Sequence, residues 1–230
     1  MIRVENIHKV YDGHRGPHTV LHNTSFTVPR GFRLGILGRN GAGKSTLIRL
    51  ISKIELPTSG QVTHEMSVSW PLGFGGTFQG SLTGIDNMRF IARIYRTDFA
   101  KLREFVDEFA ELGSFLYEPV KTYSSGMRAR LAFALSIAID FDCYLIDEVI
   151  MVGDERFHER SRGHLFAPDS GRALVIASHD ASFIENTCDG AVVISNGRTR
   201  YFTDVSQALQ LYKALQQVLP TPINQPAYPS

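Results

Sequence analysis

A glycine-rich segment near residue 40 has the composition of a phosphate-binding loop. Residues 38–46 read GRNGAGKST, after an apolar strand predicted over 33–37 and before a helix predicted from Lys44. The glycines let the backbone curl so that its N–H groups point at phosphate oxygens. Lys44 adds positive charge for β and γ phosphates, and Ser45 can bind Mg²⁺. The expected phosphate-binding residues are Gly38, Asn40, Gly41, Ala42, Gly43, Lys44, Ser45 and Thr46. A chance glycine-rich turn is the alternative, and the strand-to-helix context disfavours it.

Two adjacent acids end a second apolar strand, predicted over residues 143–146 of the sequence CYLIDE. Side chains alternate in direction along a strand, so Asp147 and Glu148 face different ways and can do different work. Asp147 can hold the magnesium shell, while Glu148 polarises the attacking water as a catalytic base. The alternative is a solvated strand end, which the apolar run before the acids disfavours.

A histidine, His179, ends a third apolar strand in the sequence VIASHD. Most histidines are structural or exposed, and the other seven carry no such positional signal. A strand beside the Asp147 strand would bring His179 to the γ-phosphate edge, where an imidazole can hydrogen-bond phosphate and the attacking water. His179 is therefore predicted to be catalytic, together with Glu148 and Lys44.

The stretch KTYSSGMRARLAFAL, residues 121–135, is predicted to begin a helix with small polar residues. Arg128 and Arg130 fall in its first turns, where cations oppose the helix dipole. Two explanations remain open at this level. The segment is either an ordinary serine cap or an anion site built on a helix N-terminus.

Composition narrows the possible classes of protein. The chain has 230 residues and 43% hydrophobic content, which suits one large globular α/β domain or two small lobes. Lys and Arg number 24 against 23 Asp and Glu, so the net charge of +1 gives no electrostatic argument for a nucleic-acid partner. The two cysteines, Cys143 and Cys188, are too few for a disulfide framework and lack metal-ligand spacing, which favours a reducing cytoplasm. No signal-peptide pattern opens the chain, and no stretch reaches the roughly 18 apolar residues that a membrane span requires.

Strand-like and helical runs alternate along the chain, which predicts an α/β fold. Three successive helical segments over residues 84–139 interrupt the alternation and are expected to form a subdomain inserted into the core. We expect a single domain over residues 1–215. The Asn196-Gly197 dipeptide predicts a tight hairpin. The Pro-rich tail, residues 216–230, is expected to be disordered.

These motifs in this order resemble the nucleotide-binding subunit of ATP-binding-cassette (ABC) transporters across essentially residues 1–215. The resemblance implies a P-loop ATPase fold with an N-terminal antiparallel β part and an inserted helical subdomain. It also implies ATP and Mg²⁺ as ligands. In this family a signature sequence, usually L-S-G-G-Q, begins a subdomain helix, and residues 123–127, YSSGM, look like its counterpart. The signature then caps a γ-phosphate held by a second copy, with Ser124, Ser125 and Gly126 contacting the nucleotide; Ser125 and Met127 replace the usual Gly and Gln.

Three further residues match family elements singly. Tyr11 in HKVYDG matches the aromatic that stacks on adenine, with an ordinary strand tyrosine as the alternative. Asp154 falls where the family has an Asp at its dimer contact. Gln79 is the candidate for the family's glutamine that begins the helical subdomain and joins Ser45 and Asp147 at the metal. Its spacing to Asn87 in the sequence is shorter than usual in the family. A plain loop residue is the alternative.

A narrower resemblance rests on residues 69–84, SWPLGFGGTFQGSLTG, and on the segment from Tyr123 to Asp154. These look like the branch that exports polysaccharides, as capsule or O-antigen, from Gram-negative bacteria. O-antigen exporters often carry a further carbohydrate-binding domain, and the chain length favours capsule export. The resemblance implies a peripheral ATPase on the cytoplasmic face of the inner membrane, dimeric, with a separate polytopic permease and a polysaccharide substrate. Export of another lipid-linked glycan, and a soluble non-transport ABC ATPase, remain as alternatives.

Overall fold

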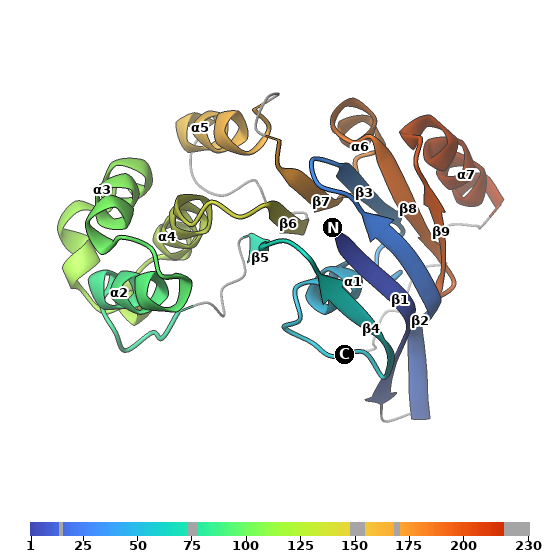
Figure 1. Ribbon diagram of the computed structural model, residues 1–230, viewed down its shortest axis with the longest axis horizontal. Coiled ribbons are helices and arrows are strands. Elements are labelled where there is room, and N and C mark those ends of the chain that lie inside the picture. The colour runs from blue at the N-terminus through green and yellow to red at the C-terminus, as the bar shows by residue number, and fades with distance from the viewer. Residues whose placement is uncertain (14–15, 73–77, 148–154, 168–170, 219–230) are drawn as a thin grey trace, which may run out of the picture.

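The computed structural model describes residues 1–13, 16–72, 78–147, 155–167 and 171–218. A nine-stranded sheet runs through the molecule in the order β4-β1-β2-β9-β8-β3-β7-β6-β5 (Figure 1). The strands are β1 (Ile2–Gly13), β2 (Gly16–Val28), β3 (Arg33–Gly38), β4 (Ser59–His64), β5 (Val68–Leu72), β6 (Cys143–Asp147), β7 (Ala173–Ala177), β8 (Gly190–Ser195) and β9 (Arg198–Phe202). The helices are α1 (Lys44–Ile51), α2 (Gly84–Tyr95), α3 (Phe99–Ala110), α4 (Ser125–Ala138), α5 (Glu155–Leu165), α6 (Ala181–Thr187) and α7 (Val205–Val218), with short 3₁₀ turns at Gly113–Tyr117 and Val120–Thr122.

The sheet has an antiparallel part and a parallel part. β1 pairs antiparallel with both β2 and β4, whereas β8, β3, β7, β6 and β5 run parallel to one another. The parts meet at β2 and β9, where His22 pairs with Arg198. The predicted hairpin joins β8 to β9 through Asn196 and Gly197, which have φ angles of 50° and 73° as such a turn requires.

Helices cover both faces of the parallel part. The apolar face of α1 packs on one side against β3, β6 and β7, in a core that contains Ile36, Leu145 and Val175. On the other face, α6 and α7 pack against β3 and β8 (Figure 1). Because alternate residues of a strand face opposite sides, neighbours such as Ile36 and Leu37 belong to different cores.

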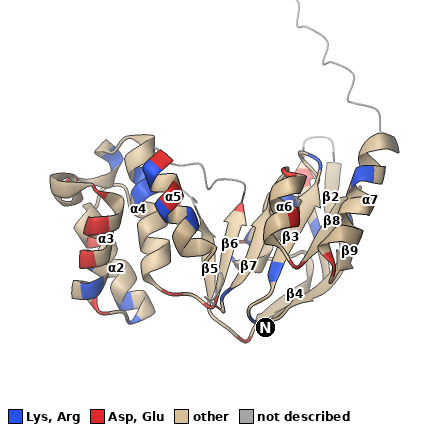
Figure 2. Ribbon diagram, turned by 90° about the horizontal axis from the view of Figure 1, so that it is seen from above, with Lys and Arg blue, Asp and Glu red and all other residues tan. Residues whose placement is uncertain are grey.

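Helices α2, α3 and α4 form a part of their own to one side of the sheet (Figures 1 and 2). Their first turns are fixed by side-chain caps: Thr83 accepts from the backbone N–H of Asp86, and Asp98 accepts from that of Ala100. The three helices lie between Gly84 and Ala138. Figure 2 shows acidic positions along α3 and basic positions on α4 and α5, and Arg160 of α5 pairs with Glu111 just after α3 at 2.7 Å.

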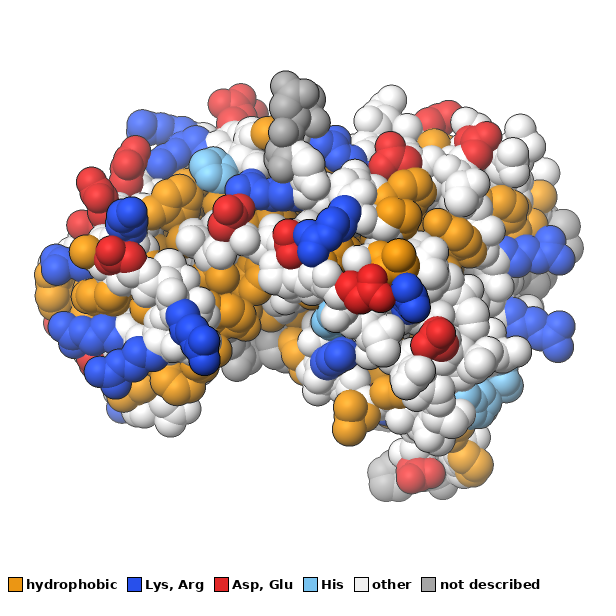
Figure 3. Space-filling model, in the orientation of Figure 1, with side chains coloured by type: hydrophobic (Ala, Val, Ile, Leu, Met, Phe, Trp, Pro, Cys, Tyr) orange, Lys and Arg blue, Asp and Glu red, His pale blue; other side chains and the backbone are white. Residues whose placement is uncertain are grey.

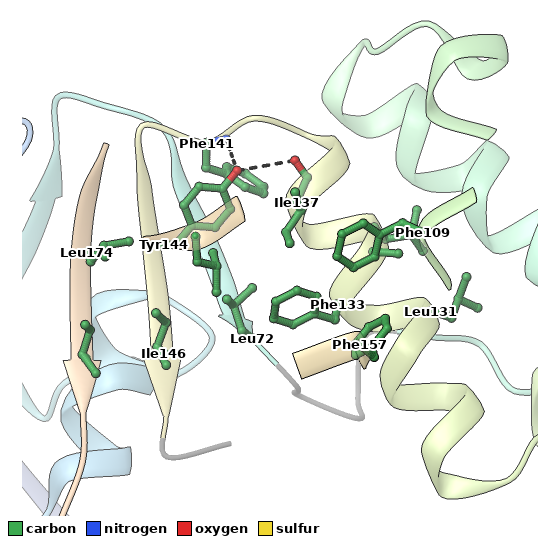
Figure 4. Close-up of a cluster of buried hydrophobic side chains, with 14 of the residues drawn as sticks. Leu72, Phe109, Leu131, Phe133, Ile137, Phe141, Tyr144, Ile146, Phe157 and Leu174 are labelled. Atoms are coloured by element: carbon green, nitrogen blue, oxygen red, sulfur yellow. Dashed lines mark hydrogen bonds between the residues drawn. The ribbon is translucent and has the colours of Figure 1, made fainter. Parts of the chain in front are cut away.

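An aromatic cluster joins the helical part to α5. Phe133 of α4 lies with its ring centroid 6.1 Å from that of Phe109 and 5.7 Å from that of Phe157 (Figure 4). Between this cluster and the sheet, the Tyr144 hydroxyl lies 3.5 Å from the carbonyl oxygen of Ile137 and 3.2 Å from the backbone nitrogen of Phe141. Burial raises the pKa of Tyr144, so its hydroxyl stays protonated as a donor near neutral pH.

The fold confirms the expected P-loop architecture with an antiparallel β part and an inserted helical subdomain. Strands β4 and β5 were not predicted from the sequence, and β1 and β2 are long strands of 12 and 13 residues. The predicted tail lies almost entirely outside the described residues. Among the helices that the structure describes, none is both long and apolar enough to span a bilayer.

Phe133 is expected to be a main contributor to the stability of the helical part. The substitution Phe133→Ala should lower the free energy of unfolding by about 3–5 kcal/mol, because it leaves a cavity between two other buried rings. Urea unfolding followed by circular dichroism measures the change. Phe115→Ala is the matched control, since that ring is 52% exposed, and it should change stability by less than about 0.5 kcal/mol. Equal losses for the two variants would contradict this account of the core.

Candidate nucleotide-binding site

The glycine-rich loop lies between the carboxyl end of β3 and the first turn of α1. Gly41 and Gly43 have φ angles of 78° and 107°, which side chains rarely tolerate. A Cβ at Gly43 would also lie 2.8 Å from Cγ1 of Val20 on β2. Glycine is therefore required at Gly43 both by the backbone angle and by the packing of the loop on the sheet.

Lys44 lies across this loop and is only 6% exposed. Its Nζ donates to the carbonyl oxygen of Gly38 at 3.0 Å and lies 3.5 Å from that of Arg39. An ammonium group at this depth is poorly solvated, so an incoming phosphate would gain a strong charge-assisted hydrogen bond from it. A cavity of about 330 Å³ is lined by Val20 and by the loop residues Asn40, Gly41, Gly43, Lys44, Ser45 and Thr46. Six of the eight predicted phosphate-binding residues thus line one cavity, and Gly38 and Ala42 do not.

The magnesium-binding prediction finds support in the contact between α1 and β6. The Ser45 hydroxyl donates to Oδ1 of Asp147 at 3.1 Å, although the two residues are 102 positions apart in the chain. One hydroxyl and one carboxylate oxygen, side by side at the edge of the sheet, are the kind of hard ligands that Mg²⁺ prefers. The pair therefore fits a magnesium ion that takes its remaining ligands from phosphate and water.

Strand register places His179 at the same edge. Ala177 of β7 pairs with Ile36 of β3 on one side and with Asp147 of β6 on the other. His179 lies two residues beyond Ala177 and is exposed. The geometry therefore agrees with the predicted position of His179 between the phosphate loop and the acidic strand end. Glu148 follows Asp147 directly; Glu148 and Asp154 both lie outside the described residues.

Tyr11 and Gln79 are placed differently with respect to the loop. The hydroxyl of Tyr11 lies 3.5 Å from Oγ1 of Thr46, so the aromatic is beside the helix that carries the phosphate loop. The Gln79 side chain donates to Oγ of Ser81 at 3.3 Å, and its backbone N–H donates to Asn87. These contacts belong to the start of α2 and do not include Ser45 or Asp147. A metal-binding role for Gln79 stays a prediction.

The signature-like segment begins α4 with a serine cap. Ser124 has extended backbone angles, and its hydroxyl accepts from the backbone N–H of Met127 at 3.2 Å. The N–H groups of Ser125 and Gly126 open the helix, where no preceding turn supplies an acceptor. A Cβ at Gly126 would have only the Ser124 hydroxyl within 4 Å, at 3.9 Å. The serine cap is therefore present, and the anion site at this helix terminus stays a prediction.

The two arginines near this terminus have structural partners. Nη1 of Arg128 donates to the carbonyl oxygen of Tyr123 at 2.6 Å, just before the helix, and the Arg130 guanidinium lies 5.4 Å from the ring centroid of Phe157. The Tyr123 hydroxyl donates to the carbonyl oxygen of Phe115, and burial raises the pKa of that tyrosine. The cations thus stabilise the turn and the packing beneath it, which offsets their unfavourable position in the helix dipole.

A strand, a curled glycine loop with an inward lysine, and a helix serine beside an acidic strand end define a P-loop nucleotide-binding protein. A profile of the family described as ABC transporter matches residues 21–151, more than half of the chain. The chain belongs to the ABC transporter family.

Several relatives match almost the whole chain. It is 54% identical over 215 residues to the capsule polysaccharide export ATP-binding protein CtrD of Neisseria meningitidis, and 55% identical over 217 residues to the ATP-binding protein BexA of Haemophilus influenzae. Each alignment covers 94% of this chain and 100% of the relative. The polysialic acid transport ATP-binding protein KpsT of Escherichia coli is 42% identical over 216 residues, covering 93% and 99%. The predicted similarity to polysaccharide-export members is confirmed.

The fold is also found in solved structures. A dimeric ATP-binding cassette bound to ADP and Pi has a TM-score of 0.73 at 20% identity, covering 88% of this chain and 98% of that one. An ATP-binding subunit of an ABC transporter has a TM-score of 0.71 at 20% identity, covering 94% and 97%. At 20% identity, the structural similarity is evidence for the fold alone, and it confirms the predicted cassette architecture.

The position of Lys44 predicts its effect on nucleotide binding. Lys44→Ala should weaken ATP binding by about one to two orders of magnitude, because it removes a poorly solvated cation from the phosphate loop. Isothermal titration calorimetry in EDTA, where ATP is not hydrolysed, measures the affinity. Lys101→Ala, at an exposed position of α3, is the control and should bind as the parent does. Parent-like ATP binding by Lys44→Ala would exclude this loop as the phosphate site.

Proposed function

We propose that this ABC-type ATPase powers the export of capsular polysaccharide across a bacterial inner membrane. The observation that carries the proposal is the phosphate loop with the Ser45–Asp147 contact, in a chain 54–55% identical to relatives that it covers completely, one of them named for capsule polysaccharide export. Relatives named for O-antigen or teichoic acid export are 35–38% identical. The identities thus favour capsule over the other glycans.

ATP would be held by the loop residues, with Lys44 on the β and γ phosphates. Ser45 and Asp147 would hold Mg²⁺, which neutralises charge that develops on the phosphates. Glu148 would polarise the attacking water, and His179 would hydrogen-bond the γ-phosphate. Tyr11 would stack on the adenine ring, and Gln79 would complete the metal shell. Strand register supports a common edge for Gly38, Asp147 and His179.

A second copy of the chain would complete each site. The open helix terminus at Ser125 and Gly126 offers N–H groups and the positive end of a helix dipole to an anion. It belongs to the helical part, separate from the loop that carries Lys44 (Figure 1). Two chains arranged head to tail would each place this terminus on the γ-phosphate held by the other. ATP would then close the dimer, and hydrolysis with product release would reopen it.

A polytopic permease would be the other partner, with the ATPase peripheral on the cytoplasmic face of the membrane. The helical part carries exposed apolar side chains suited to such a contact. Phe90 and Ile94, 58% and 55% exposed, lie one turn apart on α2, and Phe115 and Tyr117 are 52% and 59% exposed. Figure 3 shows apolar side chains over this part of the molecule with Lys and Arg side chains among them. The polysaccharide would contact the permease and not this chain.

Recovery of the native protein in mild detergent tests the transport class. A polytopic membrane protein is expected to co-purify with the chain. Co-purification of ribosomal material or DNA would instead support a non-transport ABC ATPase and overturn the proposed function.

The role of Glu148 can be tested with an isostere. Glu148→Gln keeps the side-chain shape but loses the charge that polarises water, so the variant should bind ATP, fail to hydrolyse it, and accumulate as a closed dimer. Size-exclusion chromatography with and without Mg²⁺-ATP gives the mass, and phosphate release gives the rate. Glu159→Gln, exposed on α5, should turn over as the parent does. Turnover at the parent rate by Glu148→Gln would remove Glu148 from its role.

The signature terminus can be tested in the native host. Gly126→Asp should fold, because there is room for the side chain and an acid suits a helix N-terminus. It should still bind ATP through its own Lys44, but its charge would oppose the partner's γ-phosphate and prevent closure. Polymer should then accumulate inside the cell while the surface coat disappears.

Capsule staining and assay of polymer in lysed cells report the two quantities. Gly163→Asp on α5 is the matched control, since a Cβ there meets no atom within 4 Å, and it should keep the coat. An intact coat with Gly126→Asp would exclude the action of this terminus across a dimer. Loss of the coat without internal polymer would point to synthesis, and the export function would be withdrawn.

A further inference from the structure

Three charged side chains surround Tyr11 and connect β1 to the helix that carries the phosphate loop. Nζ of Lys9 lies 2.8 Å from Oε1 of Glu55, and Nε of Arg49 lies 3.0 Å from Oε2 of the same carboxylate. Arg49 also donates through Nη2 to the Tyr11 hydroxyl at 3.3 Å and to Oγ1 of Thr46 at 3.3 Å. The Glu55 carboxylate thus pairs with both Lys9 and Arg49, and each of these two cations contacts Tyr11.

The geometry around Tyr11 restricts where its ring can lie. Lys9 and Tyr11 are two residues apart on β1, and the Lys9 ammonium is 4.9 Å from the ring centroid. At the other end of the ring, the hydroxyl is held between Arg49 and Thr46, which belong to α1. The ring is therefore fixed from the strand on one side and from the phosphate-loop helix on the other.

Two of the three charged side chains in this network are largely shielded from water, and the third, Arg49, is 36% exposed. The side chains of Lys9 and Glu55 are 13% and 21% exposed, unlike the exposed Arg3–Glu65 pair on the same part of the sheet at 45% and 52%. Burial alone raises the pKa of Glu55, but hydrogen bonds from Lys9, Tyr11 and Arg49 outweigh it and hold the pKa at about 2. The carboxylate therefore stays charged throughout the working pH range. A partly shielded network of this kind holds its geometry better than a fully exposed ion pair does.

We infer that Lys9, Arg49 and Glu55 are positioning residues for the nucleoside part of a purine nucleotide, through their hold on Tyr11. The inference rests on the proposed function, in which Tyr11 stacks on the base. A base that binds to a ring already fixed relative to the loop loses less conformational freedom on binding. The network would thus make the aromatic and the phosphate loop a single rigid recognition unit, with the base on the ring face opposite Lys9.

Affinities for ATP and inorganic tripolyphosphate, measured by calorimetry on the full chain in EDTA, separate base recognition from phosphate recognition. Glu55→Gln and Lys9→Met should each weaken ATP binding by about three- to tenfold, in the range of a stacking contact. Tripolyphosphate affinity should change by less than about twofold, because the phosphate loop is untouched. Lys9→Arg keeps the cation and should restore ATP affinity.

The double variant Tyr11→Leu/Glu55→Gln tests whether Glu55 acts through the ring. Its loss of ATP affinity should equal that of Tyr11→Leu alone, since without the ring there is nothing to position. Glu65→Gln, which removes the exposed pair with Arg3, is the matched control and should leave both affinities unchanged.

Three results from the variants would overturn the inference. These are equal loss of both ligands in Glu55→Gln, parent-like ATP binding in that variant, and additive losses in the double variant. The inference would also be overturned if the parent protein bound tripolyphosphate as tightly as ATP. The assignment of the phosphate loop would still stand in that case. A parent that binds neither would refute the proposed function itself.

Discussion

The rest of the site depends on a backbone loop that must curl tightly enough to surround an anion. Gly41 and Gly43 adopt φ angles that side chains rarely tolerate, and Val20 packs against the loop so closely that a Cβ at Gly43 would clash. The loop joins the end of β3, which lies between the parallel strands β7 and β8, to the start of α1. Because parallel strands end at the same edge of a sheet, β6 and β7 bring Asp147 and His179 to the edge where this loop lies.

The helical part is held in place by aromatic packing and an ion pair. In the proposed function, the N-terminus of α4 contacts the nucleotide of a second copy. The helical part is held to α5 by the rings of Phe109, Phe133 and Phe157, and by the pair between Arg160 and Glu111. These contacts fix α4, and with it the turn that Ser124 caps and Arg128 secures. A rigid helix terminus can serve a second copy of the chain only if its own packing does not depend on nucleotide.

In the part of the chain that the structure describes, Lys44 is buried in the phosphate loop, and the partly buried charges of Lys9, Arg49 and Glu55 lie beside the helix that follows this loop. Lys44 is held by loop carbonyls, and Lys9 and Arg49 share Glu55 beside Tyr11. Desolvation makes such groups costly unless they are paired, so their geometry is well defined. The exposed pairs elsewhere, such as Arg89 with Asp86 on α2, lie in water and constrain the structure much less.

The sequence by itself determined the features that depend on neighbours in the chain. The loop at 38–46, the serine cap of α4, the Asn196-Gly197 turn and the inserted helical segment all follow from local backbone preferences, and the structure has each of them. Tertiary structure alone decided the order of the strands, the pairing of β4 and β5, the 3.1 Å contact of Ser45 with Asp147 across 102 residues, and the network of Lys9, Arg49 and Glu55 around Tyr11. Even though Lys9 and Tyr11 share a strand face, nothing local indicates which residues they meet. Such contacts depend on which distant segments pack together, and that choice is made by burial of the whole core and not by any one stretch of sequence.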